Sequence, residues 1–277
     1  MKNNSNEHII RPPKGLVDID LPEIWRFREL LYVFAWRDIK VRYKQTFVGV
    51  AWAIFQPFIT MVIFTVIFGR LAKVPSEGAP YPIFVYSGLL FWNYFSGALT
   101  AASDCLVANE SIVKKVYFPR LLLPVSTAVT PLIDFAFAFL ILVGMMIYYH
   151  FTPSLLGVVM IPVLLLISLV ASSGLGLFLA AVNAKFRDVR YVLPFSIQIL
   201  MYVTPVIYPV SIIPPKYQWL IFLNPMTGVI NCARSLLLHT GAMDWTQFLI
   251  STAVGFGLLI LGVTYFRKTE RFFADIL

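Results

Sequence analysis

The positive charges of this chain are unevenly distributed, and this imbalance constrains its fold more than any other feature. Six long apolar segments divide the sequence, and 18 of its 22 Lys and Arg residues fall in the N-terminal arm, two alternate loops and the C-terminal tail. The intervening loops hold only Arg70, Lys73, Lys216 and Arg234. This is the positive-inside pattern of a polytopic membrane protein, and it predicts that both chain ends lie in the cytoplasm.

The composition agrees with a membrane-embedded fold. Hydrophobic residues make up 59% of the chain and charged residues 13%, about half the charged fraction of a typical soluble domain. A length of 277 residues leaves room for six spans of about 20 residues each. The net charge of +8 comes from residues that flank spans, so membrane lipids explain it better than nucleic acid does. We therefore expect an all-α polytopic membrane protein with six transmembrane helices.

The chain divides into three parts. Residues 1–21 form a polar cytoplasmic arm, residues 22–47 an amphipathic interface helix, and residues 48–277 the six-span transmembrane domain. The amphipathic helix has Phe27, Leu31 and Phe34 on one face and basic residues on the others, which is typical of a helix in the membrane interface. The six spans are expected near residues 48–69, 82–103, 121–149, 155–182, 191–208 and 248–266.

Residues 209–246, between the fifth and sixth spans, are too apolar for a free loop. Pro214 and Pro215 can start one short helix, and Asn224 can cap a second one that ends before Gly241. Each piece is too short to cross a bilayer of about 30 Å. We interpret the region as a re-entrant helical hairpin on the external side, because a seventh span would place the basic C-terminal tail outside.

The sequence has no signature of catalysis. It contains no G-x-x-x-x-G-K-[ST] phosphate loop and no H-E-x-x-H motif, and its three His residues have no metal-ligand spacing. Cys105 and Cys232 are expected on opposite sides of the membrane, where they cannot pair. We therefore expect no catalytic residue, metal site or cofactor on this chain, and any energy source must be elsewhere.

Small residues recur every fourth position along the fourth span, which predicts that another helix approaches it closely. They are Ser168, Ser172, Gly176, Ala180 and Ala184.

Asp134 lies inside the third span, where an ionisable group is costly and marks an interior or water-facing position. Two interpretations remain open: a residue of a transport pathway, or a carboxylate satisfied by Thr127, Thr130 or a helix terminus.

An aromatic stripe follows one face of the fifth span. Its members are Tyr191, Phe195, Gln198 and Tyr202. Aromatic rings stack on the apolar faces of sugars, so the stripe is a candidate lining for a carbohydrate conduit, although such stripes more often belong to a core or an interfacial belt. Further aromatic residues lie in the second span and its start: Tyr81, Phe84, Tyr86, Phe91, Trp92 and Tyr94.

A short helix is expected in the internal loop 104–120, capped by Asn109 and ended by Pro119. A helix there is either a docking element that transmits rigid-body motion or an ordinary loop helix.

Four segments in the same order resemble the permeases of type-2 ABC exporters, especially the Wzm-like branch that exports O-antigen polysaccharide. They are WRDIKVRYKQTFVGVAWAIFQPFITMVIFTVIFG, VKKVYFPRLLLPV, FRDVRYVLPFSIQILMYVTPVIYP and FLNPM. The teichoic-acid and capsule permeases are near relatives. The resemblance extends from about Pro22 to the C-terminus.

The resemblance implies a homodimer in the bacterial inner membrane, driven by two copies of a separate ATPase that binds ATP and Mg²⁺. It implies that the substrate is a polysaccharide on undecaprenyl diphosphate and that residues 209–246 form an external gate. The internal loop helix would be an ATPase-coupling element formed by Asn109, Glu110, Ser111, Lys114, Lys115 and Tyr117. At the cytoplasmic entrance, an anion needs fixed cations, and Arg37, Arg42 and Lys44 are candidates to meet the diphosphate, although plain membrane anchoring explains them equally well.

Two alternatives remain from the sequence. The first is a type-2 exporter of teichoic acid, capsule, or a small lipid or drug, which the genes next to this one would distinguish. The second is a membrane enzyme or channel that acts alone, which stable co-purification with a soluble ATPase would argue against.

Overall fold

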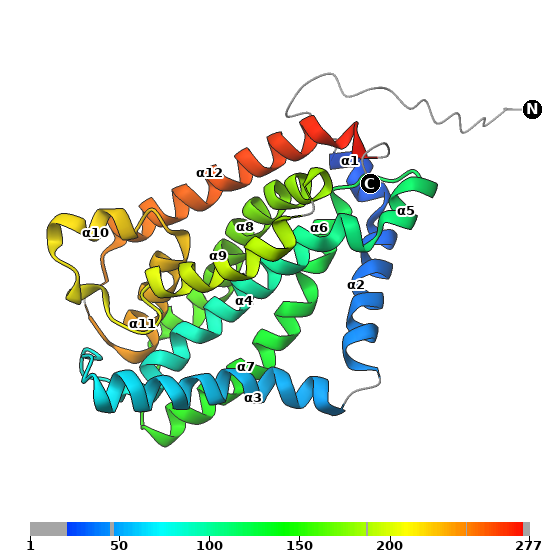
Figure 1. The fold of residues 1–277 in the computed structure, drawn as a ribbon. Helices are drawn as coiled ribbons and strands as arrows, with labels where there is room; N and C mark the ends of the chain where they lie inside the picture. The colour runs from blue at the N-terminus through cyan, green and yellow to red at the C-terminus, as the bar shows by residue number, and fades with distance from the viewer. Residues whose placement is uncertain (1–20, 45–46, 187, 242, 274–277) are drawn as a thin grey trace, which may run out of the picture.

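The computed structural model describes residues 21–44, 47–186, 188–241 and 243–273 (Figure 1). In these ranges the chain forms helices and connecting loops and no strand, which confirms the predicted all-α class. The N-terminal arm of residues 1–21 lies almost wholly outside them, as do the last four residues. The α-helices are α1 Leu21–Arg26, α2 Arg28–Tyr43, α3 Phe47–Phe64, α4 Tyr81–Ala108, α5 Glu110–Lys115, α6 Leu122–Thr127, α7 Val129–Tyr148, α8 Leu155–Lys185, α9 Val189–Val203, α10 Pro215–Ile221, α11 Pro225–Leu238 and α12 Trp245–Glu270, with a π-helix η1 Thr65–Leu71 and a 3-10 helix η2 Val210–Ile212.

The long helices run lengthwise between two ends of the molecule (Figure 1). One end, called the α5 end below, holds α1, α2, α5 and α6 together with the C-terminal part of α12. The opposite end, called the α11 end, holds α10 and α11. The loops that the charge pattern assigned to one side of a membrane, α4–α6 and α8–α9, meet at the α5 end.

Within the described residues, four helical segments are long and apolar enough to cross a membrane: Ala51–Leu71, Leu122–Tyr148, Leu155–Lys185 and Trp245–Glu270. The pair α10 and α11 is bent by 111° and is compatible with a fifth, broken span or with a re-entrant loop. α4 has 28 residues, about 42 Å at 1.5 Å per residue, but it contains no stretch as apolar as those in these four segments. α9 has only 15 residues. The six-span count and the hairpin therefore stay predictions.

α4 is the central helix of the larger hydrophobic core. The aromatic side chains that the sequence placed in and near the second span are all 9% exposed or less: Tyr81, Phe84, Tyr86, Phe91, Trp92 and Tyr94. They pack with residues of α7, α8 and α11 in one cluster. These rings are core packing in this chain and are covered by neighbouring helices.

α8 packs closely against α4 on one face and against α12 on another. The small residues predicted to form a contact stripe are all buried: Ser168, Ser172, Gly176, Ala180 and Ala184. A Cβ atom at Gly176 would lie 2.5 Å from the Cβ of Ala102 on α4. On the other face, a Cβ at Gly262 of α12 would lie 2.0 Å from the carbonyl oxygen of Gly174. The predicted close approach is confirmed, and glycine permits it on both faces.

The apolar face of α2 packs against protein at the α5 end. Phe34 is buried in a second core with Phe118 and Phe266, and Phe27 and Leu31 pack against the same cluster. The exposed face of α2 carries aromatic and basic side chains instead, including Tyr32, Trp36, Lys40 and Lys44. The side that meets the surroundings is therefore the aromatic and basic one.

We expect Gly262→Ala to destabilise the protein by about 1–3 kcal/mol, because the added methyl group forces α8 and α12 apart. Gly257→Ala on the same helix is the matched control, since a Cβ there meets nothing within 4 Å. Thermal unfolding in detergent measures both, and equal midpoints for the two variants would contradict the packing argument.

Candidate functional site

A groove lies between the long helices and extends to the α5 end. Its inner hollow, of about 540 Å³, is lined by residues of α3, α4, α7 and α9 together with Arg42. Its outer hollow, of about 640 Å³, lies among α2, α4 and the α6–α7 region. The two hollows adjoin, because their walls share Arg42, Gly97, Ala101, Asp104 and Pro131.

A polar stripe on α4 forms one wall of the inner hollow. Asn93, Ser96, Thr100 and Asp104 follow one another at spacings of three and four residues, so they share one face of the helix. The neighbouring face, with Ala102, packs against α8. Polar side chains at the depth of a span are costly unless they face water, a ligand or protein. Sequence analysis missed this stripe, although its spacing is visible in the sequence.

The hydroxyl groups of the stripe donate to their own helix and keep oxygen lone pairs toward the hollow. Ser96 donates to the carbonyl of Asn93 at 3.3 Å, and Thr100 donates to the carbonyl of Ser96 at 2.8 Å. Asp104 accepts a hydrogen bond of 3.0 Å from the amide of Asn183 on α8. The wall therefore presents mainly acceptors to whatever fills the groove.

Asp134 on α7 is paired with α2. The Arg42 guanidinium lies 2.6 Å from one carboxylate oxygen, and the Tyr43 hydroxyl donates to the other. The interpretation that Thr127 or Thr130 satisfies this carboxylate is wrong, because Thr127 donates to the carbonyl of Pro124 and the Thr130 hydroxyl has no hydrogen-bond partner in the described part of the chain. Burial, then the hydrogen bond to Asp134, raises the pKa of the Tyr43 phenol, so Tyr43 stays a donor at physiological pH.

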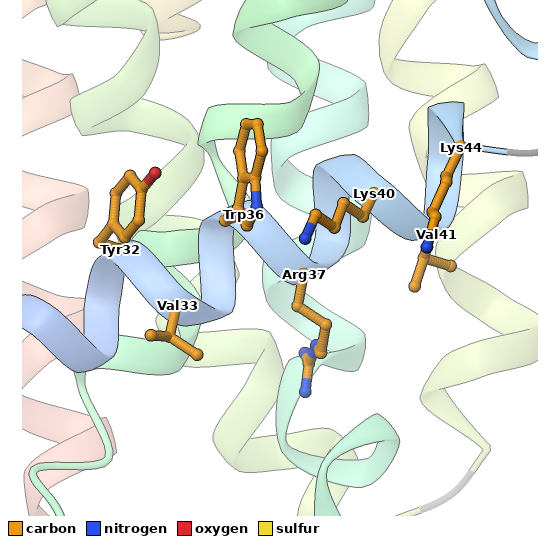
Figure 2. Close-up of a pocket in the computed structure, with 7 residues that line it drawn as sticks. All are labelled: Tyr32, Val33, Trp36, Arg37, Lys40, Val41 and Lys44. Carbon is orange, nitrogen blue, oxygen red and sulfur yellow. The ribbon is translucent and has the colours of Figure 1, made fainter.

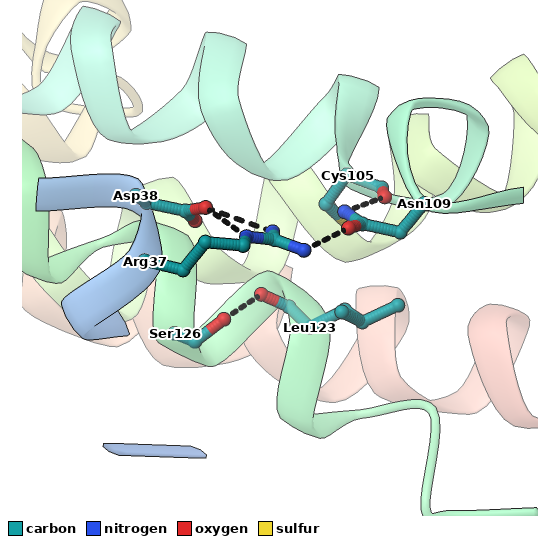
Figure 3. A network of polar contacts seen from close by, with 6 residues as sticks. All are labelled: Arg37, Asp38, Cys105, Asn109, Leu123 and Ser126. Atoms are coloured by element: carbon teal, nitrogen blue, oxygen red, sulfur yellow. Dashed lines mark hydrogen bonds and ion pairs between the residues drawn. The ribbon is translucent and has the colours of Figure 1, made fainter. Parts of the chain in front are cut away.

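A second polar contact joins α2 to the junction of α4 and α5 (Figure 3). Arg37 donates to Asp38 at 2.8 and 3.0 Å and to the amide oxygen of Asn109 at 2.7 Å. The Asn109 amide nitrogen donates to the carbonyl of Cys105 at 2.8 Å. Asn109 thus precedes α5 as predicted, but its side chain makes no cap hydrogen bond. It binds α2 and α4 instead.

The sequence suggested that Arg234 is an ordinary cation of an external loop. In the structure it lies on α11 and is buried, with 3% of its surface exposed. It donates to the carbonyl oxygens of Phe84 at 3.1 Å, Pro205 at 2.6 Å and Val206 at 2.5 Å, and its guanidinium lies 3.7 Å from the Phe84 ring centre. The Tyr81 hydroxyl donates to the next carbonyl, that of Ile207, at 2.7 Å. These donors satisfy the non-helical backbone between α9 and α10, which must otherwise find partners away from water.

Comparison with known proteins assigns the family. The profile of the ABC-2 type transporter family matches residues 29–238, which include α2, the groove and Arg234. The chain belongs to the ABC-2 type transporter family.

Individual relatives align along most of this ABC-2 chain. The O-antigen export system permease protein RfbA of Klebsiella pneumoniae is 30% identical over 249 residues, covering 90% of this chain and 95% of that protein. RfbA of Myxococcus xanthus is 28% identical, covering 91% and 97%. The polysialic acid transport protein KpsM of Escherichia coli is 24% identical, covering 85% and 91%.

The predicted coupling residues of this ABC-2 chain lie on or beside α5. The helix runs from Glu110 to Lys115 and ends before Pro119, and Lys114 pairs with Glu110 at 2.6 Å. Val113 is buried in the core of the α5 end. Four of the predicted residues are exposed: Ser111, Lys114, Lys115 and Tyr117. The predicted helix is confirmed, and its docking role stays a prediction.

The three predicted entrance cations lie in different surroundings. Arg42 faces the groove and Asp134. Lys44 lines a hollow of about 590 Å³ on the outer side of α2, where Tyr32 and Trp36 stack and Lys40 lies over the Trp36 ring (Figure 2). Arg37 borders both this hollow and the groove. Their role toward a diphosphate stays a prediction.

The predicted aromatic stripe lies on an exposed face of α9. Tyr191 is 84% exposed, Phe195 64% and Tyr202 48%, and Gln198 is exposed with them. α9 contributes Pro194 and Ile197 to the groove wall instead. The stripe therefore faces outward from this chain, and its role as a conduit stays a prediction.

We expect Arg234→Met to destabilise the protein by at least about 2 kcal/mol, because each buried carbonyl that loses its donor costs about 1–3 kcal/mol. Lys216→Met is the matched control, since Lys216 is exposed on α10 at the same end. Thermal unfolding and limited proteolysis near residues 204–209 measure the effect. Identical behaviour of the two variants would show that Arg234 does not hold this segment.

Proposed function

We propose that this chain is the membrane subunit of an ATP-driven exporter that moves a polysaccharide, such as an O-antigen or a capsule polymer, across the cytoplasmic membrane. The observation that carries the proposal is a polar groove among apolar helices in a chain that aligns over 85–91% of its length with permeases named for polysaccharide export. A water-soluble polymer needs such a polar path through lipid.

In this proposal the energy comes from a separate ABC ATPase present in two copies. The sequence holds no phosphate loop, and membership of the ABC-2 family favours a partner that binds ATP and Mg²⁺. The exposed side chains of α5 support its role as the docking element, and α5 lies at the end where the basic loops meet. That end is then cytoplasmic, in agreement with the charge pattern.

The contacts of α2 offer a route from the docking helix to the groove. Arg37 donates a hydrogen bond to Asn109, the residue before α5. About one and a half turns further along α2, Arg42 and Tyr43 bind Asp134 in the groove wall. A short helix displaced by an ATPase would therefore move α2, and α2 would move the α7 wall.

The substrate in this proposal is a glycan on a lipid diphosphate, and the chain works as a homodimer. Arg37 and Arg42 border the groove, Arg37 and Lys44 border the hollow on the outer side of α2, and these three cations can meet the diphosphate at this entrance. The outward face of α9, with Tyr191, Phe195, Gln198 and Tyr202, is available to a second copy and to a conduit between the two copies.

Depletion of the protein tests the function. We expect a lipid-linked polysaccharide to accumulate on the cytoplasmic side, because synthesis continues while export stops, and lipid extraction with compositional analysis measures it. Unchanged surface glycan without accumulation would favour a small lipid or drug as the substrate.

A charge exchange tests the contact between Arg42 and Asp134. We expect Arg42→Asp and Asp134→Arg each to abolish export, because each places like charges together, and the double variant to restore a large part of it. The pair is partly exposed and contributes at most about 1 kcal/mol to folding, so surface polysaccharide is the readout. If the double variant stays inactive, Arg42 acts through another group, as in direct binding of the diphosphate.

A further inference from the structure

The charges that line the groove largely neutralise one another. Among the lining residues that the structure describes, the cations are Arg37 and Arg42. Each is already paired with a carboxylate, Arg37 with Asp38 at 2.8 Å and Arg42 with Asp134 at 2.6 Å. Asp104, which borders both hollows, pairs with no cation of the described residues and accepts a hydrogen bond from the neutral amide of Asn183. The described lining therefore has a net charge of −1.

The remaining polar groups suit hydroxyl groups. Asp104, Asn93, Ser96 and Thr100 present oxygen acceptors on the α4 wall. A ligand that donates hydrogen bonds to these oxygens and accepts hydrogen bonds in return suits this wall. Sugar hydroxyls do both.

A polyanionic glycan fits this lining poorly. Each carboxylate-bearing sugar would pass Asp104 without a fixed cation to offset the repulsion, and like-charge contacts in a protein site are strongly unfavourable. A conduit built for such a polymer would be expected to present unpaired Arg or Lys side chains along its wall.

We propose that the groove binds an uncharged, hydroxyl-rich glycan and that Asp104 selects against polyanionic glycans. This inference rests on the proposed function and specifies its substrate class. The lipid diphosphate stays outside the groove, in the hollow on the outer side of α2 that Arg37 and Lys44 border, while the neutral sugar units occupy the groove.

The experiment compares two polymers in one strain background. The chain and its partner ATPase are expressed with a lipid-linked neutral hexose polymer or with a lipid-linked sialic-acid polymer, and surface polymer is quantified for each. We expect the neutral polymer to be exported at least about tenfold better, since like-charge repulsion of this kind is worth at least that factor. Asp104→Asn, which keeps the shape of the side chain, should bring the ratio close to one.

The ratio within one variant separates selectivity from folding, because a loss of folded protein lowers export of both polymers equally. Asp188→Asn is the matched control, since Asp188 is an exposed acid outside the groove, and it should keep the wild-type ratio. Equal export of both polymers by the wild type, or an unchanged ratio in Asp104→Asn, overturns the inference and leaves the proposed function intact. Export of neither polymer by the wild type overturns the proposed function itself.

Discussion

The close packing of α8 between α4 and α12 is the constraint on which the rest of the molecule depends. Glycines and other small residues bring the backbones together, and Gly174 and Gly262 leave no room for a side chain between α8 and α12. In lipid, where apolar surface gains little from contact with another helix, such close van der Waals packing holds helices together. Because α4 gives one face to α8, its polar face is left to form the groove wall.

Polar contacts then fix the parts that small-residue packing cannot hold. At the α5 end, α2 is joined to the α4–α5 junction by Arg37 and to α7 by Arg42 and Tyr43. At the α11 end, Arg234 and Tyr81 satisfy four carbonyl oxygens, those of Phe84, Pro205, Val206 and Ile207, three of them in the broken backbone after α9. Both sets join segments far apart in sequence: the first joins α2 to the groove wall, and the second joins α11 and α4 to the segment after α9.

The charges that line the groove bear on which kind of polymer this chain carries. The relatives are named for O-antigen export and for polysialic acid transport, which are chemically different cargoes. The family match does not distinguish between them, whereas paired guanidinium groups and a carboxylate in the groove favour a neutral polymer. Substrate class is thus argued from the site rather than from the fold.

The sequence by itself determined the helical class, the membrane character, the short helix before Pro119 and the small-residue stripe on α8, because these follow from composition, local breakers and helical periodicity. It could not determine which partners the isolated charges take. Two interpretations of Asp134 stayed open and Asn109 was assigned to a helix cap, whereas both side chains bind α2, 91 and 72 residues away in the chain. Arg234 was taken for a loop cation, and the aromatic residues of α4 were noted without a role. Only the tertiary structure decided these points, because burial and pairing depend on which helices are in contact. Helical periodicity predicts which residues share a face of a helix, but it does not predict which other helix packs against that face.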